Sequence, residues 1–312
     1  MCGVWWFATL FLVVAAIVDA EFISGHAFHA LARWSSDQLY KNNLPNVNNL
    51  KSGDGMFFRC YPGAMHPHLK PMRDLAARDG SKFVLYVHNC DGSFVANTNE
   101  LKILSGFVSR VYAINDVCGE ACMPLVQPIP LGFVDSHLHK DKAHAVFEGV
   151  AHRNLKKEHL LFMNFMVHNN GHDPKRVPCR DHFAGKPWVL HKGSGLSPPA
   201  TYELTAKSKY VVSPQGAGFD CHRTYEAIYL GAIPIVESSP LDYFYKHLPI
   251  IIVDHWTEVT EDFLIKNYND HKKALDGWKA QYPGWITAEF WVSGGDQGPF
   301  GTESNSNSTS NI

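Results

Sequence analysis

One short stretch of the chain carries the groups that nucleotide binding requires. Gln215–Gly218 is a glycine-containing loop after a β-rich run, and such a loop can bring backbone N–H groups close to an anion. A helix is expected to begin near Asp220, where free N–H groups and the positive end of the helix dipole favour phosphate. Arg223 falls in its first turn, where a guanidinium can bind a diphosphate through two parallel hydrogen bonds. Glu226, three residues later on the same helix face, suits a ribose diol.

The same pattern also has a purely structural explanation. Strand–glycine–helix turns occur throughout α/β proteins, and a lone Gly-x-Gly is a weak signal. Arg223 and Glu226 could be no more than an i,i+3 ion pair on the protein surface. From these residues alone both explanations stand.

The elements around this stretch alternate between strands and helices. The chain contains β-rich runs at residues 82–88, 110–115, 126–133, 159–165, 209–213, 232–236 and 248–253. Helices are expected at residues 100–109, 201–207 and 222–230, with another beginning at 260–267. Continuous Val/Ile runs indicate buried parallel strands, so we predict an α/β fold with right-handed crossovers. A break near residues 128–132 divides it into domains at 21–130 and 131–293, with a cleft between them.

The stretch Ser213–Leu264 resembles the nucleotide-sugar-binding half of the exostosin-like glycosyltransferases. It contains a glycine loop, His-Arg, an aromatic residue, Glu-Ala, Gly-x-Ile-Pro-Ile-Val, and Leu-Pro before a hydrophobic strand. "PIPLGF" (128–133) and "LLFMNFMVHNNGHDPKR" (160–176) are similar too, and "YVHNCDGSF" (86–94) is the most family-like piece of the first domain. The resemblance implies two Rossmann-like domains in the GT-B architecture. It also implies hexosyl or pentosyl transfer from a nucleotide sugar to a glycan or glycoprotein acceptor.

The resemblance also implies roles for individual residues. Arg223 would contact the donor diphosphate and Glu226 the ribose of the donor nucleoside. The remaining expected donor-binding residues are Gly216, Gly218, His222, Ser238 and Ser239. The chain contains no Asp-x-Asp, the usual metal–diphosphate ligand pair of the other large glycosyltransferase architecture. We therefore expect no cofactor and no metal, with Arg223 and the helix dipole stabilising the leaving diphosphate.

A reaction that inverts the anomeric centre needs a general base to deprotonate the acceptor hydroxyl. We expect this base from the first domain, in a loop that faces the cleft. Asp91, after the strand at residues 82–88, is the first candidate, and His88 is the second. Asp91 has a structural alternative as a residue that caps its own loop.

A second motif points to a different reaction. Residues 132–139 (GFVDSHLH) resemble the first-strand metal motif of amidohydrolases, because His137 and His139 would face one side of a strand and share a metal. Asp141 and His144 follow closely. The chain after His139 is too short for the rest of a barrel of typically ~250 residues, so an exposed His-rich loop is favoured. A metal-dependent hydrolase and a non-catalytic carbohydrate-binding pseudoenzyme are the alternative functions.

The ends of the chain and its cysteines bear on its location. Residues 1–20 predict a signal peptide or an uncleaved signal anchor, which would give the only membrane contact. Either places the chain in the lumen of the secretory pathway (Golgi or ER) or outside the cell. Six cysteines follow residue 20, and an even number there predicts disulfides; Cys118 and Cys122 could close a local loop or, less favoured, bind zinc. Residues 294–312 predict a disordered tail with one glycosylation sequon at Asn307.

The overall charge gives no reason to expect a nucleic-acid partner. Lys and Arg total 28 and Asp and Glu total 30, so the formal net charge is −2. Nucleic-acid binding depends on an excess of positive charge facing the phosphate backbone, which this composition lacks.

Overall fold

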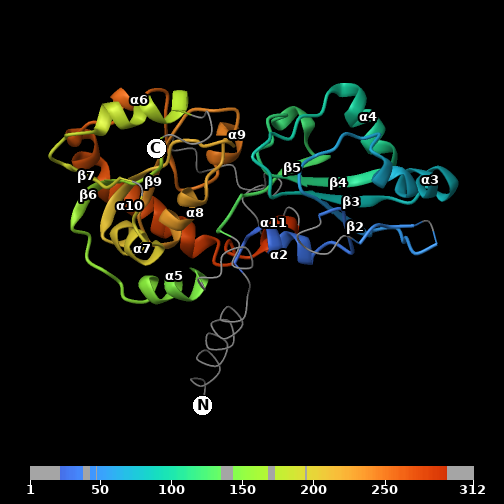
Figure 1. Ribbon diagram of the computed structural model, residues 1–312, viewed down its shortest axis with the longest axis horizontal. Coiled ribbons are helices and arrows are strands. Elements are labelled where there is room, and N and C mark those ends of the chain that lie inside the picture. The colour runs from blue at the N-terminus through green and yellow to red at the C-terminus, as the bar shows by residue number, and fades with distance from the viewer. Residues whose placement is uncertain are drawn as a thin grey trace, which may run out of the picture.

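The computed structural model describes residues 22–37, 43–46, 48–134, 143–167, 173–193 and 195–293. This part of the chain forms a mixed α/β structure with two five-stranded sheets and ten α-helices (Figure 1). Every ladder within the two sheets is parallel, so the predicted α/β class is confirmed. The segments behind the targeting and tail predictions, residues 1–20 and 294–312, lie outside the described residues.

The first sheet follows the order of the chain. Its strands pair in the order β1-β2-β3-β4-β5. They span Trp34–Ser35, Gly55–Phe58, Phe83–Val87, Val108–Ala113 and Val126–Pro128. The helices between them are η2 (Pro67–Leu69), α3 (Lys70–Asp79), α4 (Thr98–Phe107) and η3 (Glu120–Cys122).

The second sheet has a different order, β10-β9-β8-β6-β7. Its strands are β6 (His159–Met163), β7 (Val189–His191), β8 (Ser208–Val212), β9 (Ile233–Glu237) and β10 (Ile251–Val253). The helices of this half are α5 (Ala143–Ala151), α6 (Asp173–Phe183), α7 (Pro198–Ala206), α8 (His222–Tyr229), α9 (Asp242–Tyr245), η4 (Trp256–Glu258) and α10 (Glu261–Gln281). Strands β6 and β8 are neighbours in the sheet. The chain runs from β6 to β7 toward one edge of the sheet and from β8 to β9 toward the opposite edge, so the direction of winding reverses between β6 and β8.

Local sequence explains where several elements begin and end. Helix α4 begins after Asn97, whose side chain accepts hydrogen bonds from two backbone N–H groups, and α10 begins after Thr260, whose side chain accepts one from Phe263 N. Helix α8 is followed by Gly231 at φ +72°, a left-handed conformation that favours glycine, as the sequence predicts.

One predicted boundary was wrong. Val108 and Ser109, expected in a helix, belong to β4, because the β-branched Val108 pairs with Phe83 of β3. The run at 126–133, expected as a strand followed by a loop, forms the strand Val126–Pro128 and then a loop. The helix expected to begin at 260–267 begins at Glu261 and continues to Gln281.

Two short helices, α2 (Gly25–Ala30) and α11 (Ala288–Val292), lie at the junction of the two sheets (Figure 1). Ile23 N donates to Ile286 O at 2.7 Å and so joins the two segments. Residues of the first sheet contact α11 directly: Gln127 Nε2 donates to Trp291 O at 2.8 Å, and Tyr112 OH donates to Val292 O at 2.7 Å. A single buried cluster consequently includes side chains from both halves.

The carboxyl ends of the two sheets meet at a second junction. Asp220 N, after β8, donates to Asn115 Oδ1, after β4, at 2.9 Å. Tyr243 OH of α9 donates to Asp116 Oδ2 at 2.5 Å. The loops that follow the strands of one sheet therefore contact those of the other.

Four of the cysteines after residue 20 are paired, Cys60 with Cys90 and Cys118 with Cys122. Cys179 is a buried free thiol and Cys221 a half-buried one. Such pairs are compatible with an oxidising compartment. In the described part of the chain, no helix is both long and apolar enough to cross a membrane.

Candidate functional site

The reversal of winding between β6 and β8 marks a place where ligands bind in open α/β sheets. Adjacent strands whose connections leave in opposite directions open a crevice outside their carboxyl ends. Asn164, Phe165 and Met166 follow β6, and the loop 213–218 follows β8. Helix α8 begins beside them at His222. The predicted phosphate loop therefore lies at the reversal point of the second sheet.

Both glycines of this loop lie in close contact with polar side chains. Neither adopts a positive φ. A Cβ on Gly216 would come within 2.6 Å of Arg176 Nη2, and one on Gly218 within 2.7 Å of Asn115 Nδ2. The loop is closed by a hydrogen bond from Gly216 N to Gly218 O at 3.0 Å. Glycine here lets the loop lie against an arginine of its own half and an asparagine of the other.

Arg223 lies in the first turn of α8 with part of its guanidinium unused. Its Nε donates to Asn164 O at 3.1 Å. Its Nη1 is buried and has no hydrogen-bond partner among the described residues. The guanidinium carbon lies 5.7 Å from the centre of the Phe165 ring. A buried donor without a partner costs about 1–3 kcal/mol, so this atom has unmet capacity for an acceptor.

A second arginine lies at the same point, and the sequence analysis did not identify it. Arg176 on α6 is 7% exposed; its Nε donates to Gln215 O at 3.1 Å and its Nη1 to Met166 O at 2.7 Å. Its guanidinium carbon lies 6.0 Å from the centre of the Phe165 ring. Burial lowers the pKa of Arg176, and the positive charge of Arg223 lowers it further. Arg176 is the last residue of the family-like run at 160–176. It is far from Arg223 in the sequence, so nothing in the sequence indicated that the two arginines lie in one site.

Neither arginine forms an ion pair with a carboxylate in the described ranges. Two adjacent cations in a partly buried setting repel each other unless an anion lies between or beside them. The arrangement is therefore suited to a negatively charged ligand.

Glu226 is half-buried one turn further along α8. Burial raises the pKa of this carboxyl to about 7, and Arg223 opposes the shift. Across the described residues, Glu226 forms neither a hydrogen bond nor an ion pair with Arg223, so the surface ion pair considered above is not formed. Burial raises the pKa of the Tyr202 phenol on α7, and the charge of Glu226 raises it further. A carboxylate without a bond can accept ligand hydroxyls.

The other predicted donor-binding residues form hydrogen bonds within the protein. His222 Nδ1 forms a hydrogen bond with Gly132 O at 2.8 Å. Ser238 Oγ donates to Asp242 Oδ2 at 2.6 Å, and Ser239 N donates to Asp242 Oδ1 at 2.9 Å. Both serines thus stabilise the start of α9, and these hydrogen bonds do not involve an arginine.

The two candidate bases differ in exposure. Asp91 is exposed, in the loop after β3, and follows the disulfide-bonded Cys90. His88 has no exposed surface; its Nε2 bonds to Pro130 O at 3.2 Å and its ring stacks on Phe28. A buried imidazole in these contacts cannot reach an acceptor hydroxyl without rearrangement, so the geometry favours Asp91 over His88.

Asn115 connects the Asp91 loop to the glycine loop. Its Nδ2 donates to Cys90 O at 3.3 Å, while its Oδ1 accepts from Asp220 N. Asn115 is buried and left-handed, with φ +48°. Asn115 was not predicted as part of the site, because asparagine is common in turns and its presence there does not indicate a function.

Most of the competing metal motif lies outside the described residues, namely His137, His139 and Asp141. His144 is described, and its Nε2 forms a hydrogen bond with Val134 O at 2.9 Å. Within the described ranges, no group of three or more His, Cys, Asp or Glu side chains is placed to hold a metal ion.

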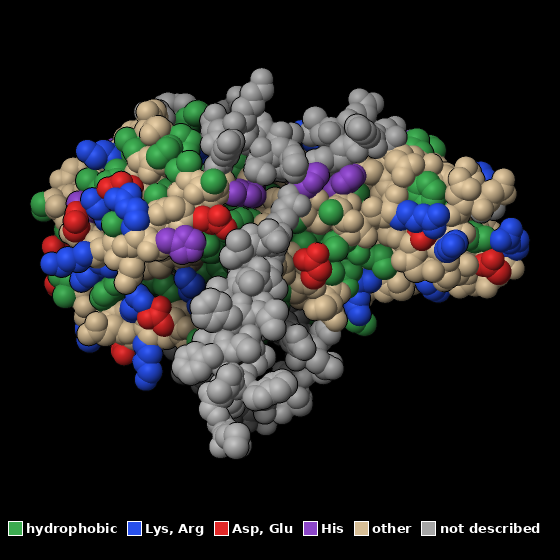
Figure 2. Space-filling model, turned by 90° about the horizontal axis from the view of Figure 1, so that it is seen from below, with side chains coloured by type: hydrophobic (Ala, Val, Ile, Leu, Met, Phe, Trp, Pro, Cys, Tyr) green, Lys and Arg blue, Asp and Glu red, His purple; other side chains and the backbone are tan. Residues whose placement is uncertain are grey.

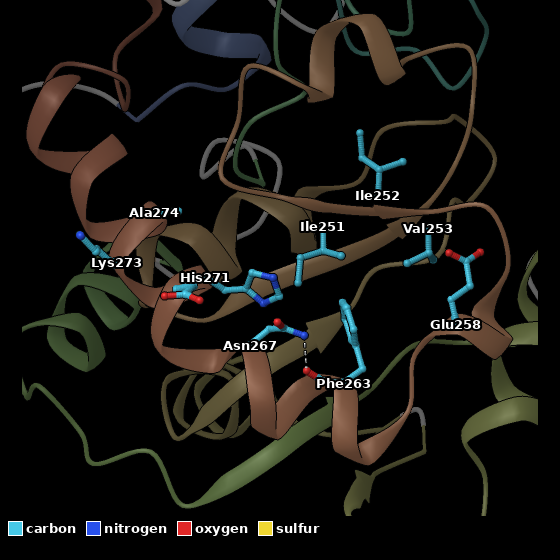
Figure 3. A pocket seen from close by; sticks show the side chains of 10 residues that line it. Ile251, Ile252, Val253, Glu258, Phe263, Asn267, His271, Lys273 and Ala274 are labelled. Atoms are coloured by element: carbon cyan, nitrogen blue, oxygen red, sulfur yellow. Dashed lines mark hydrogen bonds between the residues drawn. The ribbon is translucent and has the colours of Figure 1, made fainter. Parts of the chain in front are cut away.

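Two surface features lie apart from the arginines. A groove of about 750 Å³ runs between the edge strand β10 and helix α10, lined by residues such as Ile252, Phe263 and His271 (Figure 3). None of the predicted donor-binding residues lines it. On the face drawn in Figure 2, Lys and Arg side chains are interspersed with Asp and Glu.

Comparison with known proteins adds no assignment. No protein-family model matches this chain, and no curated protein matches it significantly.

Proposed function

We propose that this protein is a glycosyltransferase that transfers a sugar from a nucleotide-sugar donor to a glycan or glycoprotein acceptor. The two parallel sheets would be Rossmann-like domains of the GT-B architecture, as in the exostosin-like enzymes that Ser213–Leu264 resembles. The observation that carries the proposal is the buried, unpartnered Nη1 of Arg223 beside the glycine loop, at the reversal of the sheet. An anionic group at that point would complete the hydrogen bonding of the guanidinium.

On this proposal the donor diphosphate lies at the N-terminal turn of α8, beside the guanidinium of Arg223. The positive end of the helix dipole adds to the guanidinium charge there. These groups stabilise the leaving diphosphate as negative charge develops on it, so that no cation is required. Glu226 accepts hydrogen bonds from the ribose hydroxyls, with Tyr202 close by.

The acceptor would approach from the first sheet. Its hydroxyl oxygen attacks the anomeric carbon and forms the new glycosidic bond, while the bond from that carbon to the diphosphate oxygen breaks. The diphosphate leaves with the electron pair, and Asp91 takes the hydroxyl proton. Asn115 holds the Asp91 loop against the glycine loop through its two hydrogen bonds.

The proposed location is the lumen of the secretory pathway or the cell exterior. The apolar segment at residues 1–20 and the two disulfides support it. The membrane would be a partner only if that segment remains attached.

A thermal-shift screen of nucleoside diphosphates against the purified chain, in the presence of a chelator, tests the proposal. Uridine or guanosine diphosphate at one hundred times its dissociation constant should stabilise the fold by about 2.7 kcal/mol. Binding that requires added manganese would contradict the metal-independent part. Failure of every nucleoside diphosphate and nucleotide sugar, with or without metal, would refute the function. If one zinc ion per chain copurifies with the wild type and is lost when His137 and His139 are replaced, the metal-dependent hydrolase is favoured instead.

A further inference from the structure

We infer that Arg176 and Arg223 act together as a two-guanidinium clamp that selects a diphosphate over a monophosphate. The inference rests on the proposed function, since it concerns the same ligand. It adds a second binding residue, from a different helix and a different sequence region.

Arg176 is held in place before any ligand arrives. Its Nε and Nη1 donate to carbonyl groups of the loops that follow β8 and β6. Its Nη2 lies over Gly216, where any side chain would come within 2.6 Å. An arginine has five N–H donors in a rigid plane, so two bonds to carbonyls leave donors for a ligand. The side chain is thus already oriented toward the glycine loop.

The two guanidiniums lie beside one aromatic ring. Arg176 and Arg223 lie 6.0 and 5.7 Å from the centre of the Phe165 ring, which is itself buried. Both also donate to the segment 164–166 after β6, so a common support sets their relative position.

The charge balance indicates what the pair binds. Both guanidiniums lie beside the Phe165 ring, and burial together with the positive charge of Arg223 lowers the pKa of Arg176. No carboxylate pairs with either of them in the described part of the chain. A guanidinium pairs with the oxygens of a phosphoryl group through parallel hydrogen bonds, and an anion with two adjacent phosphoryl groups can occupy both guanidiniums at the same time. A nucleoside diphosphate presents two such groups next to each other.

Arg176 could instead serve only to hold the two loops together. A lysine at this position keeps the charge and can still bond to one carbonyl, but it lacks the fork. A clamp and a structural tie therefore predict different results for Arg176→Lys when two ligands are compared.

The experiment measures binding of four probes by calorimetry in chelator: uridine diphosphate, uridine monophosphate, inorganic pyrophosphate and inorganic phosphate. The wild type should bind the diphosphate at least about ten-fold more tightly than the monophosphate, and pyrophosphate more tightly than phosphate. Arg176→Lys should lose at least about ten-fold for the diphosphate while its monophosphate affinity changes less than about two-fold. Arg180→Lys is the matched control, because Arg180 lies on the same helix and pairs with Asp181. It should behave as the wild type.

Each outcome separates the inference from the proposed function. If Arg176→Lys keeps the wild-type preference for the diphosphate, the clamp is refuted while the glycosyltransferase proposal stands. If no nucleotide binds but pyrophosphate does, and Arg176→Lys abolishes that binding, the clamp stands and the proposed function fails. If Arg176→Lys does not fold, the wild-type comparison decides, because equal affinity for the diphosphate and the monophosphate overturns the inference without any variant.

Discussion

Arg223→Lys keeps the positive charge of the proposed site but removes its planar fork. In the wild type, Arg223 Nε donates to Asn164 O, and Arg223 Nη1 is buried without a partner among the described residues. The guanidinium can therefore bond to the protein through Nε and to the proposed ligand through Nη1. A lysine ammonium cannot bond to Asn164 O and reach the ligand in the same geometry. A hydrogen bond involving a charged group contributes about 1.5–3 kcal/mol. Loss of one such bond predicts that affinity for a nucleoside diphosphate falls about 10- to 150-fold.

The unliganded protein should respond differently. The substitution loses the bond to Asn164 but also removes a buried donor that has no partner, and the two effects oppose each other. We therefore expect the melting temperature to change by only a few degrees, about the shift that 1 kcal/mol produces in a protein of this size. Arg153→Lys is a matched control, because Arg153 forms an exposed ion pair with Glu203, and such pairs contribute about 0–1 kcal/mol.

Calorimetric titration with uridine and guanosine diphosphates measures the binding effect, and urea denaturation measures stability. Arg223→Lys keeps the positive charge that acts on Glu226, and the two residues form no ion pair, so Arg223→Lys and Glu226→Gln should have nearly additive effects on the free energy of unfolding without ligand, within ~0.5 kcal/mol. Coupling should arise only when ligand is bound. Wild-type diphosphate affinity in Arg223→Lys, with a normal melting temperature, would exclude α8 as the donor site.

Three further outcomes are expected. Burial raises the pKa of Glu226 to about 7, so the folded protein holds the carboxyl proton more tightly than the unfolded chain does. The stability that this difference contributes is fully present below the unfolded-state pKa near ~4.5, and it is lost as pH rises through about 7. Diphosphate affinity should rise over the same interval as the carboxylate forms, and Glu226→Gln, titrated with the same ligand, should remove that part of the pH dependence. Asp220 is buried, which raises the pKa of its carboxyl, and its carboxylate accepts four hydrogen bonds. Asp220→Asn should therefore reduce the free energy of unfolding, measured by urea denaturation, by about 2–4 kcal/mol. Asp276→Asn is the control, because Asp276 is exposed, and it should cost under ~1 kcal/mol. Mass spectrometry of unreduced protein should find the two disulfides described above and two free thiols after residue 20; six free thiols would contradict both the pairing and the proposed location.

The buried strands illustrate what could be predicted locally. The runs at residues 82–88 and 209–213 are β-rich, and the structure has strands there: β3 is one residue shorter at each end, and β8 is shifted by one residue. Continuous apolar runs have few alternatives to a buried parallel strand. By contrast, β1 and β2 were not predicted, because two or four residues carry too little periodicity to be distinguished from a loop.

The role of His88 shows the limit of arguments from sequence. A histidine at the end of a strand is a reasonable general base by residue type. It is fully buried here because Phe28, from the distant helix α2, stacks on its ring, and because Pro130 O bonds to its Nε2. Ser238 and Ser239 are similar, since both hydrogen-bond to Asp242 at the start of α9. Contacts between separate segments decide such cases.

The α/β class, the glycine loop, and the position of Arg223 and Glu226 on the helix after it could be predicted locally, because each depends on residues that are close in the chain. The pairing of β6 with β8 became known only from the fold, and this pairing brings α6 and its Arg176 to the glycine loop. Strand order depends on how whole sheets pack, and local spacing carries no information about it. The same reason explains Asn115: the carboxyl ends of the two sheets must meet before it can bond to both loops.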